Sequence, residues 1–218
     1  TDALTWQCAS TLAAEYVAVL PTSHEWLLEH LVAPQISQAH VVLVTPAVGG
    51  AGATTLACTL ASLYVRQGLS VCLVDADSTG SNVDVTLGAE HVTGLRWNDV
   101  TDLVGQVTGV ELFASLPQHE QLRFLTWKRG ESRTTVTNVQ QVIESLASAC
   151  DVLIVDAGRL SDPLTQELSK LATTTLIVMT NTVQSCSAVA NGWTSHQSEF
   201  LGESSGLVIR EVSGAGLG

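Results

Sequence analysis

The sequence predicts an α/β fold in which a mostly parallel β-sheet is covered by helices on both faces. Two observations predict it: apolar runs of strand length alternate with segments of helical periodicity, and a glycine-rich turn joins one of these runs to a helix. Strands that are buried on both faces read as continuous apolar runs, as these do. With 218 residues, 45% of them hydrophobic and 14% charged, the chain can bury a sizeable core.

A short strand and a helix are expected before the main sheet. Residues 16–21 (YVAVLP) read as the strand, and Ser23 is placed to cap the helix. One face of that helix would consist of Trp26, Leu27, His30 and Leu31. The proline in the following stretch, residues 33–38, disfavours helix continuation and indicates a linker. One strand and one helix cannot bury their own apolar face, so this segment is either the tail of a preceding domain or an extra layer on the main one.

The main domain alternates between strand and helix up to residue 210. Strands are expected at residues 41–45, 70–75, 110–116, 151–156, 174–180 and 207–210. Helices are expected where apolar side chains recur at helical spacing, namely Leu56, Leu60 and Leu63, then Val136, Val139, Ile143 and Leu146, then Leu164, Leu168 and Leu171. Ligands of parallel sheets lie beyond the carboxyl ends of the strands. Polar or small residues follow three strands at that end: the glycine loop after Val44, D-A-D at 75–77 and D-A-G at 156–158.

The charge balance argues against several partners. Nine Lys and Arg residues against twenty-one Asp and Glu give a formal net charge of −12, which repels nucleic acid and anionic lipid. No apolar run approaches the roughly 18 residues that a membrane span needs. We therefore expect a cytoplasmic chain without direct nucleic-acid binding or direct membrane insertion. The six histidines are scattered without a nucleophile pattern, so acyl-transfer chemistry has no support.

The five cysteines are widely spaced and contain no C-x-x-C pair or nearby histidine at ligand spacing. A metal cluster or a disulfide framework is therefore not expected. Three of the cysteines lie in apolar or small-residue stretches, where a free thiol behaves as a small core residue. The two tryptophans at 97 and 127 lie in a poorly patterned region, residues 90–133, where we expect core or edge packing in preference to contact with a partner.

The loop at residues 48–55 (VGGAGATT) joins a buried strand to a helix. Backbone amides and a helix N-terminus form an anion site in this context. Gly49, Gly50 and Gly52 let the backbone curl close to a phosphate, and Thr54 is placed to offer its hydroxyl to Mg²⁺. The sequence therefore predicts a phosphate-binding loop here.

The loop departs from the common phosphate-loop pattern G-x-x-x-x-G-K-[ST]. Ala47 stands where that pattern has its first glycine, and Ala53 stands where it has lysine, so that only Gly52 and Thr54 match. A glycine-rich strand-to-helix turn of purely structural origin is the alternative interpretation.

Carboxylates follow two of the expected strands. Asp75 and Asp77 can contact Mg²⁺ through water or polarise an attacking water, although an Asp-x-Asp turn that caps its own loop is the alternative. Asp156 ends a second buried strand, which is common in α/β folds and gains weight here because a glycine loop precedes it.

Three motifs together resemble the MinD/ParA class of P-loop proteins. The loop VGGAGATTLA is similar to that class's deviant loop K-G-G-x-G-K-[ST]-T, with the signature lysine replaced by Val48 and the phosphate lysine by Ala53. VCLVDADSTG resembles its switch I strand end, and DVLIVDAG its Walker B and switch II segment. The order and spacing of the three match, so the resemblance covers roughly residues 39–210.

Within the class, the chain looks closest to the CpaE/TadZ-like branch, including actinobacterial septum-site-determining proteins from the helicase/secretion neighbourhood. Those proteins share the lysine-free GGAGA[ST]TLA loop, a segment like GLRW at 94–97 and a receiver-like N-terminal domain. The resemblance implies a three-layer P-loop NTPase fold at residues 40–218, with a linker at 34–39. Residues 1–33 would then be the C-terminal remnant of a receiver-like domain, and the P-loop domain would be truncated at its C-terminal end.

The resemblance also implies roles for individual residues. Nucleotide would contact the loop residues Gly49, Gly50, Ala51, Gly52, Ala53, Thr54 and Thr55. Magnesium would be held by Thr54 and, through water, by Asp75 and Asp156, and Asp77 would be the switch I residue, the one catalytic candidate. Asn181 is a candidate for reading the adenine, and Arg210 stands where many relatives carry asparagine. The implied cofactor is ATP or ADP with Mg²⁺.

Loss of both lysines removes positive charge from the β- and γ-phosphates, so hydrolysis is expected to be slow or absent. Binding is less affected, because backbone amides and Mg²⁺ still neutralise much of the triphosphate. Arg159, directly after Gly158, is the nearest candidate for a substitute cation, and a surface salt bridge is the alternative role.

Three functions remain open at this point. The first is an atypical ATP-binding spatial regulator that dimerises and positions pilus-assembly, secretion or septum machinery, recruited to a pole or septum through those partners. The second is a scaffold that has stopped using nucleotide and acts through protein contacts. The third, a metabolic relative such as an iron-sulfur reductase or small-substrate ligase, needs cluster cysteines or an intact lysine, and the sequence has neither.

Overall fold

The computed structural model describes residues 3–11, 14, 16–24, 26–27, 39–77, 79–80, 82–100, 107–129, 138–194 and 204–212. Several sequence-based expectations concern residues outside these ranges. They are residues 34–38 of the expected linker, His30 and Leu31 of the first helix and Val136 of a later one.

The described strands form one mostly parallel sheet in the order β1-β8-β7-β2-β6-β3-β5-β4. Their bounds are Tyr16–Leu20 (β1), His40–Pro46 (β2), Val71–Asp75 (β3), Gln118–His119 (β4), Leu122–Leu125 (β5), Val152–Asp156 (β6), Thr174–Thr180 (β7) and Ser204–Arg210 (β8). β8 pairs in parallel with β1 and β7, and β3 pairs in parallel with β6 and β5. β4 is antiparallel to β5. The predicted α/β fold class is confirmed.

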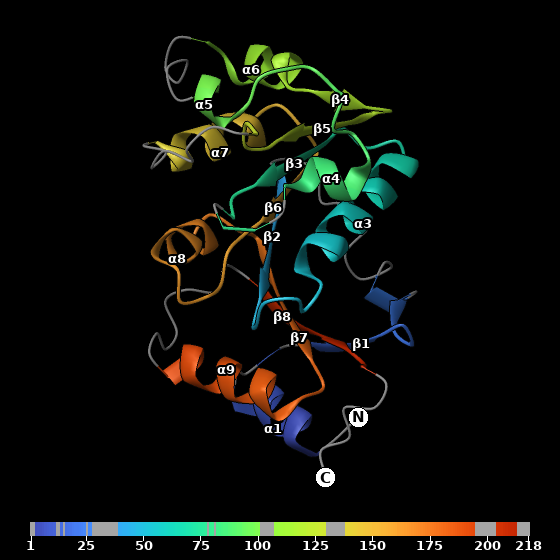
Figure 1. The fold of residues 1–218 in the computed structure, drawn as a ribbon, viewed down its shortest axis with the longest axis vertical. Coiled ribbons are helices and arrows are strands. Elements are labelled where there is room, and N and C mark those ends of the chain that lie inside the picture. Colours follow the sequence, from blue (N-terminus) through green and yellow to red (C-terminus); the bar gives the residue numbers. More distant parts are fainter. Residues whose placement is uncertain are drawn as a thin grey trace. The chain divides into compact units, whose positions relative to one another are not determined.

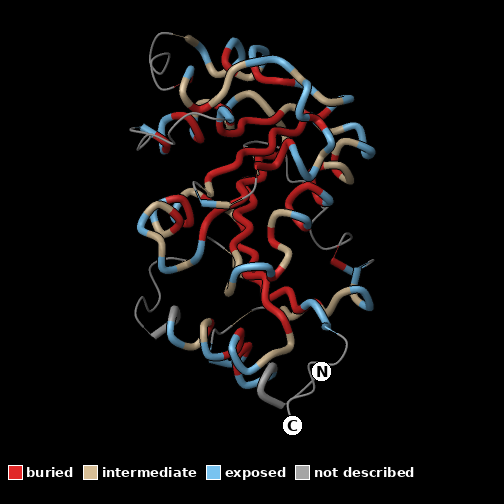
Figure 2. Tube along the Cα trace, in the orientation of Figure 1, coloured by how far each residue is buried: buried red, intermediate tan, exposed pale blue. Residues whose placement is uncertain are grey.

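The described helices have bounds Ala3–Thr11 (α1), Ala53–Arg66 (α3), Val83–Leu87 (α4), Trp97–Val100 (α5), Gly109–Ser115 (α6), Val139–Ala147 (α7), Pro163–Ser169 (α8) and Val183–Thr194 (α9), as Figure 1 shows. The helices expected from leucine spacing are confirmed as α3, α7 and α8. Every residue of β3, β6 and β7 is buried, and the buried strands stand out in Figure 2. That burial explains why these strands read as continuous apolar runs.

The chain divides into two compact units. Unit 1 comprises Thr1–Pro34, Leu43–Ala53 and Ala157–Gly218, and unit 2 comprises Gln35–Val42 and Thr54–Asp156. Strand β2 contributes residues to both.

In unit 1, α1 and α9 lie alongside each other (Figure 1) and cover the strands β7 and β8. Their shared apolar core contains Cys8, Ala9, Ile177, Met179, Cys186, Val189, Leu207 and Ile209. The expected strand at 16–21 is present as β1 and pairs with β8 from Tyr16 opposite Gly206 to Leu20 opposite Arg210. A Cβ at Gly206 would collide with the Tyr16 ring, so the two strands fit each other closely. The receiver-remnant assignment of residues 1–33 stays a prediction.

In unit 2, α3 buries the face that includes Leu56, Leu60 and Tyr64. The tryptophans Trp97 and Trp127 are both buried, with ring centroids 5.8 Å apart, which confirms their expected role in core packing.

Four of the five cysteines in the chain are also buried, as expected of small core residues. Within the described residues, no helix is long and apolar enough to span a bilayer.

The prediction of a strand at residues 110–116 is wrong, because this segment forms helix α6. The helix is fixed by a capping box: Thr108 accepts a hydrogen bond from the Glu111 amide, and the Glu111 carboxylate accepts one from the Thr108 amide. The strand that pairs with β3 comes later, as β5. The T-x-x-E spacing was the available sequence signal, and the apolar residues around it obscured it.

Two truncations distinguish this helix from the expected strand. In a strand, residues 110 and 112 share a face, whereas in α6 Val110 is 65% exposed and Leu112 only 3%. We expect Leu112→Ala to lower the free energy of unfolding by about 2–5 kcal/mol, because it leaves a cavity. Val110→Ala should change it by less than about 0.5 kcal/mol. Urea denaturation of the two variants checks this, and equal losses would contradict the helix.

Candidate functional site

The glycine-rich loop connects β2 to α3 and forms a tight turn in unit 1. The Ala51 amide donates to the Val48 carbonyl at 3.2 Å. Gly50 has a φ of +76° and Gly52 a φ of +104°, values that residues with a side chain adopt only with strain. These two glycines are therefore required by the turn itself, whatever the loop binds.

The base of the loop is fastened to neighbouring strands by hydrogen bonds. The buried hydroxyl of Thr45 donates to the Gly158 carbonyl at 2.7 Å, and the Ala47 amide donates to the Val178 carbonyl at 2.8 Å. The Ala157 amide donates to the Val44 carbonyl at 2.9 Å. Sequence reasoning did not single out Thr45, although a hydroxyl in an otherwise apolar strand run was a usable signal. The loop is thus held by rigid strand ends.

Two arginines lie against this loop. The Nη2 atom of Arg210, the last residue of β8, donates to the Gly50 carbonyl at 2.8 Å. The Arg210 Cδ atom lies 3.7 Å from the position that a Cβ would take on Gly52. The Nη2 atom of Arg159 lies 3.3 Å from the corresponding position on Gly49. Both arginines are exposed.

Asn181 and Arg210, the two residues expected near a base, lie together at the ends of β7 and β8. The Asn181 amide donates to the Arg210 carbonyl at 3.3 Å, and the Asn181 side-chain oxygen accepts from the Val212 amide at 2.9 Å. The side-chain oxygen of Asn181 therefore holds the chain beyond β8, and the Arg210 guanidinium points to the glycine loop.

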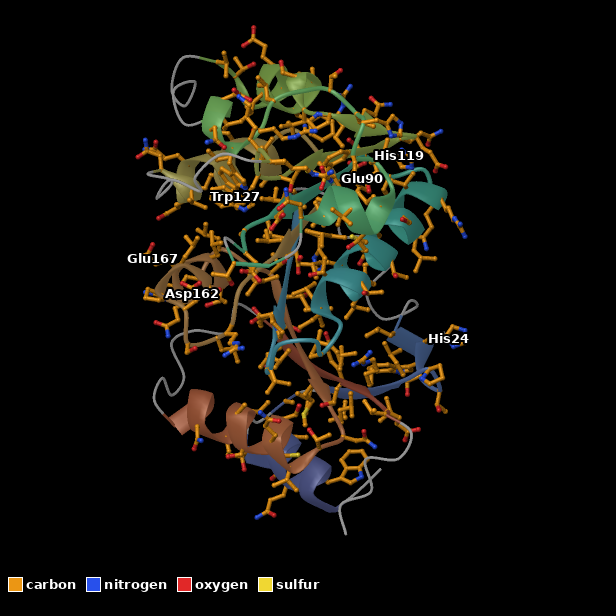
Figure 3. All side chains as sticks on the ribbon, in the orientation of Figure 1. His24, Glu90, His119, Trp127, Asp162 and Glu167 are labelled. Carbon is orange, nitrogen blue, oxygen red and sulfur yellow. The ribbon has the colours of Figure 1, made fainter. Side chains whose placement is uncertain are left out.

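The neighbours of position 158 explain why a glycine stands there. A Cβ at this position would lie 2.9 Å from the Asp162 carboxylate and 3.4 Å from the Thr165 hydroxyl. Asp162, labelled in Figure 3, caps α8 by accepting from the Leu164 amide at 3.0 Å. The absence of a side chain lets the backbone pass close to this cap.

In unit 2, Asp156 and Thr54 are brought together. Asp156 is only 2% exposed, and the Thr54 side chain lies close enough to influence the pKa of its carboxyl group. Its Oδ2 atom is buried without a hydrogen-bond partner among the described residues. Burial raises the pKa of Asp156 from 3.8 to about 7, the Thr54 hydrogen bond lowers it, and the charge of Asp77 raises it. A buried carboxylate oxygen without a partner, beside a hydroxyl, is a donor set that fits a divalent cation.

Asp75 is buried next to Asp156, its register partner on β6, but it is engaged elsewhere. Its Oδ2 atom accepts from the Thr126 hydroxyl at 2.8 Å and from the Val83 amide at 3.3 Å. Its carbonyl accepts from Trp97 Nε1 at 2.6 Å. The carboxylate thus ties β3 to α4 and to the segment after β5, contacts that sequence reasoning missed because they join residues distant in the chain.

Asp77 binds its own loop, the alternative recognised from the sequence. Its Oδ1 atom accepts from the Thr79 amide at 2.8 Å and from the Thr79 hydroxyl at 2.7 Å. Such a turn is local and stays open to solvent. Of the three acids, Asp156 is the one whose pKa the Thr54 side chain influences among the described residues.

Thr55, the last of the expected loop contacts, is exposed and lines a separate cavity of about 380 Å³ in unit 2. This cavity is bordered by α3, α4 and the β4–β5 hairpin that carries His119 (Figure 3). The Ala53 residue begins α3 and is buried, with no polar group in place of the lysine.

Comparison with known proteins identifies the family of this arrangement. A family model described as ParA, NUBPL iron-transfer P-loop NTPase, matches residues 37–193. An uncharacterised protein of Mycobacterium tuberculosis is 27% identical over 98% of this chain and 61% of its own length. The septum site-determining protein MinD of Thermotoga maritima is 27% identical over 54% of this chain and 44% of its own length. The chain thus spans less than two thirds of these relatives.

Solved structures share the fold. A ParA family ATPase from Chlorobium tepidum has a TM-score of 0.64 at 18% identity, over 79% of this chain and 73% of that one. MinD complexed with Mg-ADP from Pyrococcus horikoshii has a TM-score of 0.62 at 20% identity, over 81% and 71%. The MinC:MinD complex of Aquifex aeolicus has a TM-score of 0.61 at 21% identity, over 80% and 69%.

The buried Asp156 predicts a pH-dependent stability. Its folded pKa of about 7 lies above the ordinary 3.8, so its contribution is fully present below about pH 4 and is lost as the pH rises through 7. Asp156→Asn removes the charge and keeps an acceptor for Thr54. In metal-free buffer at about pH 8, we expect the variant to be more stable than the parent, by at most about 4 kcal/mol.

Urea unfolding of parent and variant across pH measures this difference, which should close towards about pH 4. Glu90→Gln, at an exposed carboxylate (Figure 3), is the matched control and should leave stability nearly unchanged. A variant that is less stable than the parent at every pH would contradict the prediction that burial of the charged Asp156 carboxylate destabilises the fold.

Proposed function

The chain belongs to the ParA/MinD family of P-loop NTPases, and from this premise we propose that it is an atypical ATP-binding spatial regulator with weak or no hydrolysis. Its role would be to position pilus-assembly, secretion or septum machinery. The CpaE/TadZ-like branch and a truncated receiver-like N-terminus are part of the same proposal.

One observation carries the nucleotide part of the proposal: Asp156 has a buried Oδ2 atom without a hydrogen-bond partner among the described residues, and the Thr54 side chain lies near its carboxyl group. A buried carboxylate oxygen without a hydrogen-bond partner costs free energy, and a bound cation would offset that cost. Thr54 directly follows the glycine loop in sequence, so the phosphate-binding segment and the cation-binding hydroxyl are covalent neighbours. Magnesium bound there would supply the positive charge that a triphosphate needs.

The residues of this chain would each perform a limited task. Gly49, Gly50 and Gly52 let the backbone approach phosphate, and amides from Ala51, Ala53 and Thr55 can donate to its oxygens. Thr54 and Asp156 would hold the metal ion, Asp156 through water. Asp75 was expected to do the same; its Oδ2 atom accepts hydrogen bonds from Thr126 and Val83, and its role at the metal ion through water stays part of the proposal.

Hydrolysis is where the chain departs from its family's pattern. Val48 and Ala53 carry no charge where the family has two lysines, so developing negative charge on the transferred phosphoryl is less stabilised. Asp77, bound to its own Thr79, is the candidate for orienting a water. We propose that the chain binds ATP and hydrolyses it slowly or not at all.

Dimerisation and partner recruitment complete the proposal. The MinD protein of the Aquifex structure is in a complex with MinC, and we propose that this chain likewise binds a protein partner. We also propose that the chain forms a homodimer. The net charge of −12 favours protein partners over DNA or anionic lipid, so placement at a pole or septum would be indirect.

A nucleotide-free scaffold is the second candidate, and one observation favours it. The Arg210 guanidinium already bonds the Gly50 carbonyl, so the loop has an internal partner of its own. Such a loop could keep its shape without phosphate, and the fold would then serve protein contacts alone.

Calorimetric titration with ATP, with and without Mg²⁺, separates the two candidates. We expect binding that requires Mg²⁺ and a light-scattering mass that rises towards a dimer when Mg-ATP is added. Asp156→Ala and Thr54→Val should each weaken Mg-ATP binding about tenfold or more, because each removes a ligand of the cation. Thr59→Val, at an exposed helix position, is the matched control.

The nucleotide proposal fails if the parent chain shows no heat of binding at about millimolar ATP, near the weak limit of useful affinity. The scaffold would then be the better account.

A further inference from the structure

We propose that Arg159 and Arg210 replace the two missing lysines as the cations that meet the phosphates at the glycine loop. This inference rests on the proposed nucleotide site and adds the residues that supply its positive charge. Both arginines belong to unit 1 together with the loop, and they reach it from different parts of the chain: Arg210 from the end of β8 and Arg159 from the segment that follows β6.

Arg210 is already fixed on the loop. It ends β8, where the neighbouring strand β7 leads into Asn181, whose amide donates to the Arg210 carbonyl. From this anchored backbone the side chain passes Gly52 and donates from Nη2 to the Gly50 carbonyl at 2.8 Å. One bond of this kind uses one of the five N–H groups of a guanidinium, so the others remain available to an anion at the loop.

Arg159 approaches the other glycine of the loop. It follows Gly158 directly after β6, and Thr45 fastens the Gly158 carbonyl to the base of the loop. Its Nη2 atom occupies the space beside Gly49 in which a side chain would otherwise stand. Arg159 has no ion pair among the described residues, so the salt bridge considered from the sequence is not observed there.

The scarcity of basic residues in the chain supports a role for the two arginines at the loop. Only nine Lys and Arg residues occur in 218, and two of them converge on one short loop of an otherwise acidic protein. Guanidinium is the cation best suited to phosphate, because its planar fork can donate two parallel hydrogen bonds.

Glycine at position 49 is explained by the same arrangement. Gly49 does not adopt a positive φ, so its backbone tolerates a side chain. A methyl group there would press on Arg159 Nη2, the mobile end of a long side chain. Gly49→Ala should therefore fold normally and move the arginine, which makes it a conformational probe of Arg159.

The test is titration of the parent and variants with ATP and, separately, with inorganic tripolyphosphate. We expect Arg159→Ala and Arg210→Ala each to weaken both ligands roughly 10- to 100-fold, the worth of a charge-assisted hydrogen bond. Gly49→Ala should reproduce part of the Arg159→Ala loss. Arg66→Ala, at an exposed arginine on α3, makes the same change in net charge and should weaken binding less than about threefold.

A rescue separates charge supply from folding. Adding Ala53→Lys to the Arg159→Ala, Arg210→Ala double variant should restore at least part of the lost affinity, because it returns a cation to the loop. Circular dichroism confirms that the variants are folded. Wild-type affinity for tripolyphosphate in the folded double variant would overturn the inference and leave the proposed function intact.

The two proposals also fail differently. A parent chain that binds tripolyphosphate in an arginine-dependent way, but not ATP, would support the inference and remove the proposed nucleotide function. A parent chain that binds neither ligand would overturn both.

Discussion

Because the central strands are buried on both faces of the sheet, polar and charged side chains are placed mainly at the strand ends. The position of the candidate site depends on this constraint. Side chains in the middle of β3, β6 and β7 face packed interior, where an unpaired polar group costs free energy. Polar groups therefore collect where the strands stop: Asp75 on β3, Asp156 on β6 and Arg210 on β8. The loop after β2 is held by hydrogen bonds to Gly158, to Val178 on β7 and to Arg210 on β8, which makes it a rigid feature of unit 1.

The strand ends were readable from the sequence because burial leaves a local signature. The runs VVLV, VCLVD and VLIVD have no polar residue before the terminal position, and each is a strand in the structure. Residues 110–116 failed as a strand because their apolar positions suit either period, and a two-bond cap at Thr108 decided the outcome. The N-terminal strand was found, but its place beside β8 depends on long-range pairing that no local pattern encodes.

The sequence predicted which residues belong to the candidate site, but it did not predict which of them contact one another. The glycines, Thr54 and the three acids were all chosen from spacing, yet the acids have separate surroundings: Asp75 accepts from Thr126, Asp77 accepts from Thr79, and Asp156 lies near Thr54. Thr126 lies 51 residues from Asp75 in sequence, so only the folded chain reveals the pairing. The same is true of Arg210, which reaches Gly50 across 160 residues.

The origin of the positive charge affects how a bound phosphate is coupled to the rest of the chain. A lysine at position 53 would sit on α3, the helix that the loop itself begins, and its contact would remain local. An arginine at the end of β8 belongs instead to a strand that pairs with β1 from Gly206 to Arg210 and is packed under α1 and α9. A phosphate held by Arg210 would therefore stabilise the β1–β8 pair and its helical cover in unit 1. On this assignment the loss of the lysines weakens catalysis and, at the same time, links ligand binding to the N-terminal elements of the chain.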